Sequence, residues 1–493
     1  MTATICAAAV RALRVSDADA GYLTTEGATC LLWGMTTPRE LIAAWMSLQR
    51  WYANKGALPM LEEIGSWALA CDEPGVEIVT HMFIDHTIGK PALYQVPLTY
   101  RAQRGQDEHA LVGLIDGRYV YDAPHDPAYT SALLTLITGE LEVNGDDVWV
   151  LGSHAGVERP AAVRRVSRVL TGEQSNTSIV YEPVDGRGIP LICKVFRTLH
   201  DGDNPDVELQ SALAAAGSDA VPRPVGDVLA EWNDRGQQTG RARGHLAFAQ
   251  EFLPGAEDAW GVACLAAAQG IDFSAEGYAL GVATAGVHAT LAATMATRET
   301  VQHDVDGAIA LMHGRLAAAI AEVPALAGHA AALEAVFATA ATVAWPAQQR
   351  IHGDLHLGQV LSVPGRGWVL VDFEGEPLRP MRERSRLDSP MRDVAGMLRS
   401  FDYVAGSLSV AGAVGSDYDA DPARDWAARA RTAFELGYSE ASGRDLTESR
   451  ALLDAFEIDK ALYETVYEAR NRPGWLRIPV AAIERLSARS ATA

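Results

Sequence analysis

The hydrophobic pattern predicts a chain that begins with one amphipathic helix and several strands. Apolar residues recur at 41, 45, 48 and 52, a helical spacing that predicts a helix over 38–56. Extended segments are predicted at 76–84 and 91–100, and Asp116-Gly117 and Asn144-Gly145 predict two hairpins. A short helix is predicted over 127–136. Residues 1–36 show no sustained period, so we expect a flexible tail there, or a true start at Met35.

The pattern changes after about residue 200. Residues 163–196 predict further hairpins that turn at 171–178 and 185–188. From Asn204-Pro205, a typical helix cap followed by a first-turn proline, the chain becomes rich in Ala and Leu at helical spacing. Extended segments interrupt it at 246–252, 349–351, 359–363 and 367–372. We therefore expect an α+β protein, with a small β-rich lobe followed by a large, mainly helical lobe.

Composition excludes several classes of protein. The chain has 493 residues, of which 48% are hydrophobic and 21% charged, as in ordinary globular proteins. Its net charge of -22 disfavours nucleic acid and anionic lipid as partners. No apolar run approaches the roughly 18 residues that a membrane span needs. The five scattered cysteines form no Cys-x-x-Cys pair, which argues against a zinc site and fits the reducing cytoplasm, where we expect the protein.

The segment from His352 to Gly375 carries the most chemical information. It reads as a His-Gly-Asp loop, a hairpin and an Asp-Phe-Glu end. Because a hairpin brings its two ends together, we expect Gln359 and Asp372 side by side, with Asp354 over the same opening. Mg²⁺ prefers hard oxygen ligands, so Gln359, Asp372 and Glu374 are the predicted metal ligands. Asp354 is the predicted catalytic base, five positions before Gln359 as in the protein-kinase catalytic loop.

Each of these residues also has a simpler interpretation. Asp354 alone is typical of a turn or a cap, and Asp372 at a strand end is equally ambiguous. The simpler interpretation of His352 and His356 is that each holds the loop by hydrogen bonds, as histidines in loops commonly do. The conjunction of loop, amide, hairpin and Asp-Phe-Glu end favours a kinase-type site. The sequence departs from the protein-kinase pattern by Gln in place of Asn and by Glu374 before the glycine.

A kinase-type site requires a phosphate loop and a lysine in the strand-rich part. The polar turn before the strand predicts contacts to ATP phosphates from Ser175, Asn176, Thr177 and Ser178. This turn contains no glycine, so a plain polar turn without any contact to phosphate is an equally good interpretation. Lys194, in the next strand, is the predicted partner of the α and β phosphates. Glu208 is the predicted partner of Lys194, with Asp206 as the alternative.

These motifs resemble those of bacterial maltokinases, in the aminoglycoside-phosphotransferase branch of the protein-kinase-like fold. The resemblance covers about residues 38–490 and is most specific at 388–396 and 459–476. It implies a bilobal fold with an N-terminal cap subdomain. The expected division is a tail or misassigned start at 1–36, the cap at 37–125, the small lobe at 126–255 and the helical C-terminal lobe at 256–493.

The resemblance also implies an activity. The family phosphorylates maltose at its anomeric hydroxyl with ATP and Mg²⁺, giving maltose 1-phosphate and ADP for α-glucan (glycogen) synthesis. Trehalose synthase and an α-glucan maltosyltransferase are the implied partners. The hinge between lobes places Gln250 and Phe252 near adenine. The alternatives are a kinase of glucosamine or an aminoglycoside, and an inactive kinase-like module that only binds nucleotide.

The C-terminal helix predicts the sugar site. Lys460, Glu464 and Tyr467 share one helix face, with Tyr463 beside them. A disaccharide offers hydroxyls to charged groups and flat C–H faces to aromatic rings, so this stripe suits it. His356 and Arg472, the latter just before a helix break at Pro473, are the further predicted substrate contacts. The simpler alternative is an exposed ion pair between Lys460 and Glu464.

Overall fold

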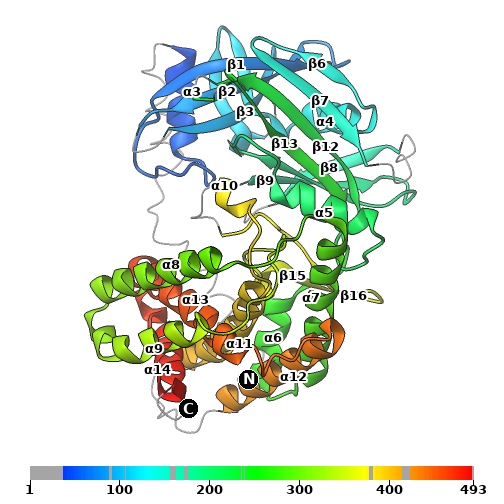
Figure 1. The fold of residues 1–493 in the computed structure, drawn as a ribbon. Coiled ribbons are helices and arrows are strands. Elements are labelled where there is room, and N and C mark those ends of the chain that lie inside the picture. The colour runs from blue at the N-terminus through cyan, green and yellow to red at the C-terminus, as the bar shows by residue number, and fades with distance from the viewer. Residues whose placement is uncertain are drawn as a thin grey trace. The chain divides into compact units, whose positions relative to one another are not determined.

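The computed structural model describes residues 37–87, 91–105, 107–155, 163–170, 176–234, 236–237, 239–376, 381–412 and 422–490. These form two compact units (Figure 1). One unit holds the described residues of Gly21–Ser211 and Pro222–Pro254, and the other holds those of Ala212–Val221 and Gly255–Ala493. The first is dominated by strands and the second by helices, which confirms the predicted α+β class. The predicted tail at 1–36, with Met35, lies outside the described residues.

The first sheet of the strand-rich unit is antiparallel, in the order β1-β2-β3-β5-β4, with β11 paired to β3. Its strands are β1 (Leu61–Leu69), β2 (Val76–Asp85), β3 (Ala92–Arg101), β4 (Leu111–Ile115), β5 (Arg118–Asp122) and β11 (Thr198–Leu199). Short 3-10 turns, η1 (Glu108–Ala110) and η2 (Ala123–His125), flank β4 and β5. The predicted turn Asp116-Gly117 joins β4 and β5 with both residues at positive φ, 49° and 75°. The hairpin prediction here is confirmed.

The first helix, α3 (Pro38–Ser47), is shorter than predicted. Thr37 and Glu40 form a capping box at its start, and Leu41 and Trp45 are buried against the first sheet. The chain then turns, so Leu48 is 59% exposed and lies off the predicted stripe. Tyr52 is buried beyond the helix because its hydroxyl donates to Asp85, 2.8 Å away. The apolar spacing therefore continues past the end of the helix because a residue of the following turn is buried by tertiary contacts.

The second sheet is antiparallel in the order β6-β7-β12-β13-β10-β9-β8. Its strands are β6 (Glu142–Asn144), β7 (Val148–His154), β8 (Arg165–Val169), β9 (Asn176–Pro183), β10 (Leu191–Phe196), β12 (Pro224–Asn233) and β13 (Arg241–Glu251). Two helices belong to this part of the chain, α4 (Pro127–Thr138) and α5 (Pro205–Ala215).

Strand β12 was expected to be helical. It lies in the middle of the sheet and is buried on both faces, so its sequence shows no alternation to mark it as a strand.

Buried polar groups join the two sheets of this unit. Arg197 is fully buried and donates to both carboxylate oxygens of Asp122 at 2.8 Å. Its guanidinium group also lies 4.9 Å from the centre of the Trp51 ring. The side-chain amide of Gln95 donates to the backbone carbonyls of Phe196 and Leu246. Because buried polar groups need partners, these bonds fix one sheet on the other.

The helical unit surrounds a small antiparallel sheet of β14 (Glu257–Asp258), β15 (Val360–Val363) and β16 (Gly367–Leu370). Its helices are α6 (Ala259–Gln269), α7 (Ser274–Thr294), α8 (Gln302–Glu322), α9 (Ala330–Ala340), α10 (Met381–Arg384), α11 (Met391–Gly412), α12 (Pro422–Ser442), α13 (Arg450–Asn471) and α14 (Arg477–Ser490), with 3-10 turns η3 (Pro324–His329), η4 (Leu357–Gln359) and η5 (Pro473–Trp475). None of the helices described is long and apolar enough to cross a bilayer.

Helices α7 and α12 approach until their backbones touch. A Cβ added at Gly281 of α7 would lie 2.2 Å from the carbonyl oxygen of Phe434. A Cβ at Gly437 of α12 would lie 2.1 Å from the carbonyl oxygen of Tyr278. Only glycine fits at these two positions, so the packing distance between the helices is set by sequence.

We predict that Gly281→Ala lowers the free energy of unfolding by about 1–3 kcal/mol, because the new methyl group overpacks against backbone that cannot rotate away. Gly286→Ala on the same helix is the matched control, since a Cβ there meets nothing within 4 Å. The control should be roughly 0.5–1 kcal/mol more stable, as alanine favours the helix. Urea unfolding followed by circular dichroism measures both. Equal stability of the two variants would contradict the close packing.

Candidate active site

The loop before β15 and the residues after β16 meet as predicted. The side-chain amide nitrogen of Gln359 donates to Oδ2 of Asp372 at 2.9 Å. The backbone N–H of Val371 donates to the carbonyl of Gln359 at 3.0 Å. The predicted proximity of Gln359 and Asp372 is therefore confirmed, and the hairpin of β15 and β16 produces it.

Asp372 has a backbone conformation that is rare for a residue with a side chain. Its φ is 66°, in the left-handed region, which costs roughly 1–2 kcal/mol for a non-glycine residue. Such strain is concentrated at functional sites. Carboxylate oxygens of Asp372 and Glu374 lie within 4.8 Å of one another. With the amide of Gln359 beside them, these hard oxygen donors fit a divalent ion such as Mg²⁺.

The buried carboxylate of Asp393, on α11, holds the loop that carries Asp354. It accepts hydrogen bonds from the backbone N–H groups of His352 and Gly353, at 2.8 and 2.9 Å. Nε2 of His288 donates to the same carboxylate at 3.0 Å. Burial alone would raise the pKa of Asp393, but the hydrogen bond and charge of His288, with the other donors, hold that pKa below its usual value. Asp393 is therefore a charged anchor for the loop.

His352 and His356 both serve the loop's geometry. Nε2 of His352 donates to the carbonyl of Val371 at 3.0 Å, which ties the loop to the hairpin. Nδ1 of His356 accepts from the N–H of Gly358 at 3.0 Å and caps η4. Burial lowers the pKa of His356, which favours the neutral ring that this bond requires. The loop-holding interpretation is confirmed for both, and a sugar contact by His356 stays a prediction.

Lys460 lies between two carboxylates. Its ammonium group donates to Oδ1 of Asp354 and to Oε1 of Glu376, both at 2.9 Å. Burial disfavours the charged amine, but the two carboxylates outweigh this and raise the pKa of Lys460 above its usual value. Lys460 therefore carries a positive charge beside Asp354. The alternative of an exposed pair between Lys460 and Glu464 is wrong, because Glu464 accepts from Arg399 at 2.7 and 3.0 Å instead.

The aromatic residues of the predicted sugar stripe lie against cations. The ring centre of Tyr463 is 5.2 Å from the ammonium nitrogen of Lys460. Tyr467 is 41% exposed, and its ring lies 5.5 Å from the guanidinium carbon of Arg472. Arg472 also lies over Trp475 and donates to Glu468. The end of α13 thus presents two aromatic rings and a paired cation, which suits the flat faces and hydroxyls of a sugar.

The strand lysine pairs with the carboxylate that was the predicted alternative. Lys194 lies in β10 opposite Ser178 of β9, and its ammonium group is 2.9 Å from Oδ2 of Asp206. Asp206 was the alternative to Glu208. The buried Asp206 is therefore a partner of Lys194. A contact of Glu208 with Lys194 stays a prediction.

The predicted phosphate contacts divide into three groups. Ser175 lies outside the described residues. Asn176, Thr177 and Ser178 belong to strand β9 instead of a turn. Thr177 is buried, and its hydroxyl accepts from Nε of Arg197 at 2.8 Å, so this oxygen already has a partner within the fold. Side chains alternate along a strand, which places Ser178 on the side of Lys194 and Thr177 on the other.

The two residues predicted to lie near adenine make hydrogen bonds within the fold, and their contact with adenine stays a prediction. The side-chain amide of Gln250 is buried and donates to Oε1 of Gln210 at 2.6 Å. Gln210 in turn donates to Asp206, so a polar chain runs from Gln250 to Lys194. The N–H of Phe252 donates to the carbonyl of Pro190 at 2.8 Å. Both groups are therefore engaged within the fold.

Sequence reasoning gave no role to Asp393, Glu376 or Gln210. Each is a buried polar residue, and its role depends on a partner far away along the chain. The available signal for Asp393 was a charged residue among apolar ones on α11, because such a residue needs a buried partner. That signal predicts a partner without identifying it.

These features define a class of protein. An acidic residue on a loop, an amide and carboxylates at hairpin ends, and a strand lysine held by a helix carboxylate characterise kinase-like phosphotransferases. The comparisons agree. Residues 167–431 match the phosphotransferase enzyme family, and residues 45–126 match the maltokinase N-terminal cap domain. The chain belongs to the phosphotransferase enzyme family and carries this cap.

Two curated relatives and one solved structure are similar to this chain over much of its length. A glucosamine kinase from Streptacidiphilus jiangxiensis is 32% identical over 296 residues, which is 56% of this chain and 64% of that protein. A glucosamine kinase from Mycolicibacterium smegmatis is 28% identical over 339 residues, 65% of this chain and 80% of that one. A crystal structure of a glucosamine kinase aligns with a TM-score of 0.63 at 23% identity, covering 92% of this chain and 99% of the other. This last likeness confirms the predicted fold.

We predict that Asp393→Asn lowers the free energy of unfolding by about 1–3 kcal/mol at neutral pH, since one acceptor oxygen and the charge are lost. The pKa of Asp393 is depressed in the folded chain, so the difference from wild type is largest above the unfolded value of about 3.9 and shrinks as pH falls below it. Urea unfolding across this range measures it. Glu334→Gln, exposed on α9, is the control and should change stability by less than about 0.5 kcal/mol. A variant as stable as this control would contradict the anchoring role.

Proposed function

We propose that the protein is an ATP-dependent sugar kinase that phosphorylates maltose at its anomeric hydroxyl, giving maltose 1-phosphate and ADP. The observation that carries the proposal is the constellation around Asp354. This carboxylate stands on an anchored loop, 2.9 Å from the ammonium group of Lys460, ahead of a hairpin whose ends join Gln359 and Asp372. Membership of the phosphotransferase family supports the reaction type.

In the proposed reaction Asp354 accepts the proton of the sugar hydroxyl as that oxygen attacks the γ-phosphoryl group of ATP. Lys460 holds one oxygen of Asp354, which fixes the direction of the carboxylate. Phosphoryl transfer needs little covalent help from the protein, so most of the rate comes from position and charge. Lys194, held by Asp206, is assigned to the non-transferred phosphates, with Asn176 and Ser178 as further contacts.

The donors of Gln359, Asp372 and Glu374 are assigned to Mg²⁺. A bound Mg²⁺ would neutralise phosphate charge. The residues themselves supply the geometry: Gln359 and Asp372 are joined by a hydrogen bond, and Asp372 is held in a strained conformation after β16. Phosphate oxygens of the nucleotide complete such sites in kinases.

Two observations support maltose as the acceptor. The cap matches the maltokinase cap domain. The carboxylates around Lys460 already have cation partners: Glu376 with Lys460, Asp459 with Arg315 and Arg392, and Glu464 with Arg399. A charge-balanced surface suits a neutral sugar better than a cationic one. On this proposal the protein acts in the cytoplasm between a trehalose synthase and an α-glucan maltosyltransferase.

Glucosamine is the second candidate acceptor. Two curated relatives carry that name, at 32% and 28% identity. An ammonium group on the sugar would need a carboxylate of its own, and the charge balance described above argues against this. The two acceptors therefore differ in the charge of the sugar and in its size, one ring against two, and can be compared directly.

The test is to incubate the pure protein with Mg·ATP and either maltose or glucosamine, to measure ADP release, and to locate the phosphate by phosphorus NMR. Turnover with maltose and a phosphate on C1 is the expected result. Turnover with glucosamine in its place would overturn the acceptor and retain the kinase. ADP release with neither, and with no other sugar, would overturn the proposed function.

We predict that Asp354→Asn lowers kcat by about a hundred- to ten-thousandfold, because the proton acceptor is lost. Binding of ATP, measured by calorimetry, should change by less than about twofold, since Asp354 is assigned no contact to the nucleotide. Asp306→Asn, exposed on α8, is the control and should keep full activity. Near wild-type kcat in Asp354→Asn would remove Asp354 from the catalytic role.

A further inference from the structure

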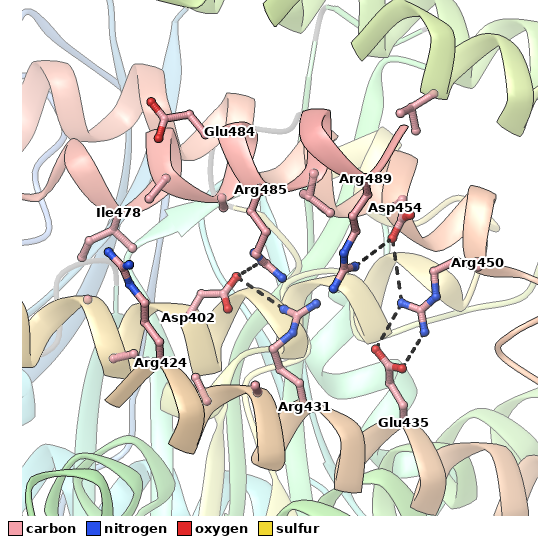
Figure 2. Close-up of a pocket in the computed structure, with 18 of the residues that line it drawn as sticks. Asp402, Arg424, Arg431, Glu435, Arg450, Asp454, Ile478, Glu484, Arg485 and Arg489 are labelled. Atoms are coloured by element: carbon pink, nitrogen blue, oxygen red, sulfur yellow. Dashed lines mark hydrogen bonds and ion pairs between the residues drawn. The ribbon is translucent and has the colours of Figure 1, made fainter. Parts of the chain in front are cut away.

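A cavity of about 1700 Å³ lies among the helices of the C-terminal part of the chain. Its walls come from α9, α11, α12, α13 and α14 (Figure 2). None of the residues assigned above to catalysis, metal or sugar lines it. Its small and apolar side chains, such as Ala405 and Ile478, form walls between charged groups. The cavity therefore needs an explanation of its own.

The charges that line the cavity reverse the balance of the whole chain. The sequence has 41 basic and 63 acidic residues. The cavity is lined by the arginines 424, 431, 450, 477, 485 and 489, against the acids 402, 435, 448, 454 and 484. In a chain of net charge -22, six arginines against five acids give this space a small local excess of positive charge, which favours an anion there.

The inner surface of the cavity holds two carboxylates between arginines (Figure 2). Asp402 accepts from Arg485 at 2.5 Å and lies 3.4 Å from Arg431. Asp454 is 3.8 Å from Arg450 and 3.7 Å from Arg489, too far for hydrogen bonds. Its Oδ1 atom is buried and has no hydrogen-bond partner among the residues that the structure describes.

An acceptor of this kind is costly when unpaired, so it points to a ligand that brings a donor. Hydroxyl groups are such donors. The outer arginines point to a different group: Arg477 and Arg489 are exposed, and a guanidinium fork binds phosphate through two parallel hydrogen bonds. None of the described residues that line the cavity is aromatic, so a nucleobase would find no ring to stack on.

We propose that this cavity binds a phosphorylated sugar, with the phosphate on the arginines of α14 and sugar hydroxyls donating to Asp454 and Glu435. Both parts of such a ligand are needed. Phosphate alone brings no donor to the buried oxygen of Asp454, and a neutral sugar brings no negative charge to the exposed arginines.

The cavity is linked to the helix that carries Lys460. Asp402 also accepts from Arg399 at 2.6 Å, and Arg399 donates to Glu464, one turn after Lys460 on α13. A phosphate that binds Arg485 would take this cation away from Asp402, and Asp402 would then interact more strongly with Arg399. If the proposed sugar-kinase function holds, the bound ligand should therefore change the KM for the sugar acceptor by at least about twofold.

Direct binding tests the site without relying on turnover. Glucose 6-phosphate, inorganic phosphate and glucose are titrated into the full chain by calorimetry. Because a kinase active site also binds phosphate groups, the titrations are repeated in Asp372→Ala, which removes a predicted metal ligand outside the cavity. We expect glucose 6-phosphate to bind both proteins equally, and at least about tenfold more tightly than either fragment.

The decisive variant is the double substitution Arg477→Gln with Arg489→Gln. Both side chains are exposed, so the fold should survive, and glucose 6-phosphate should bind at least about tenfold more weakly. Arg429→Gln, exposed on α12 and absent from the cavity lining, is the matched control and should bind as wild type does.

Equal binding by the double variant and wild type, or no binding by wild type, would overturn the site. Loss of binding in Asp372→Ala alone would place the ligand at the candidate active site and overturn it too. Binding with an unchanged KM would overturn the link to α13 while keeping the site. A chain that shows no kinase activity but binds glucose 6-phosphate through Arg477 and Arg489 would overturn the proposed function and keep this inference.

Discussion

The candidate active site depends on the buried carboxylate of Asp393. It receives two consecutive backbone N–H groups and a histidine, so it fixes the loop before Asp354 in both position and direction. A buried charge is tolerated only when it is paired and fully hydrogen-bonded, which makes this arrangement rigid. Asp354 stands one residue beyond the two donors. Its position is therefore a consequence of a helix some forty residues further along the chain.

A second feature of the helical unit is that its ion pairs lie inside it. Arg399, Arg431, Glu457 and Asp459 are all nearly inaccessible. Buried pairs of this kind add little net stability, since desolvation offsets most of the attraction between the charges. They do select one arrangement, because any other packing leaves a charge without its partner. The path from Asp402 through Arg399 to Glu464 shows how this brings the cavity and α13 into one network.

Local signals predicted most of the fold. The pair Asp116-Gly117, with both residues at positive φ, located one hairpin. The apolar spacing located the first helix, and the shift to Ala-rich spacing separated strands from helices. The failures have one cause. Strand β12 is covered on both faces and Tyr52 is buried beyond the end of a helix, so in both places burial comes from elements distant in sequence. A periodicity argument detects only burial that follows the local geometry.

The candidate site divides along the same line. The sequence by itself determined the Asp354 loop and the pairing of Gln359 with Asp372, because a hairpin and a short spacing bring these residues together locally. It also placed Lys194 in a strand. Only the tertiary structure decided that Lys460 meets Asp354, that Asp206 meets Lys194 and that Asp393 holds the loop. Lys460 and Asp354 are 106 positions apart. Contacts across such separations depend on how helices and strands pack, and one sequence without that packing contains no record of them.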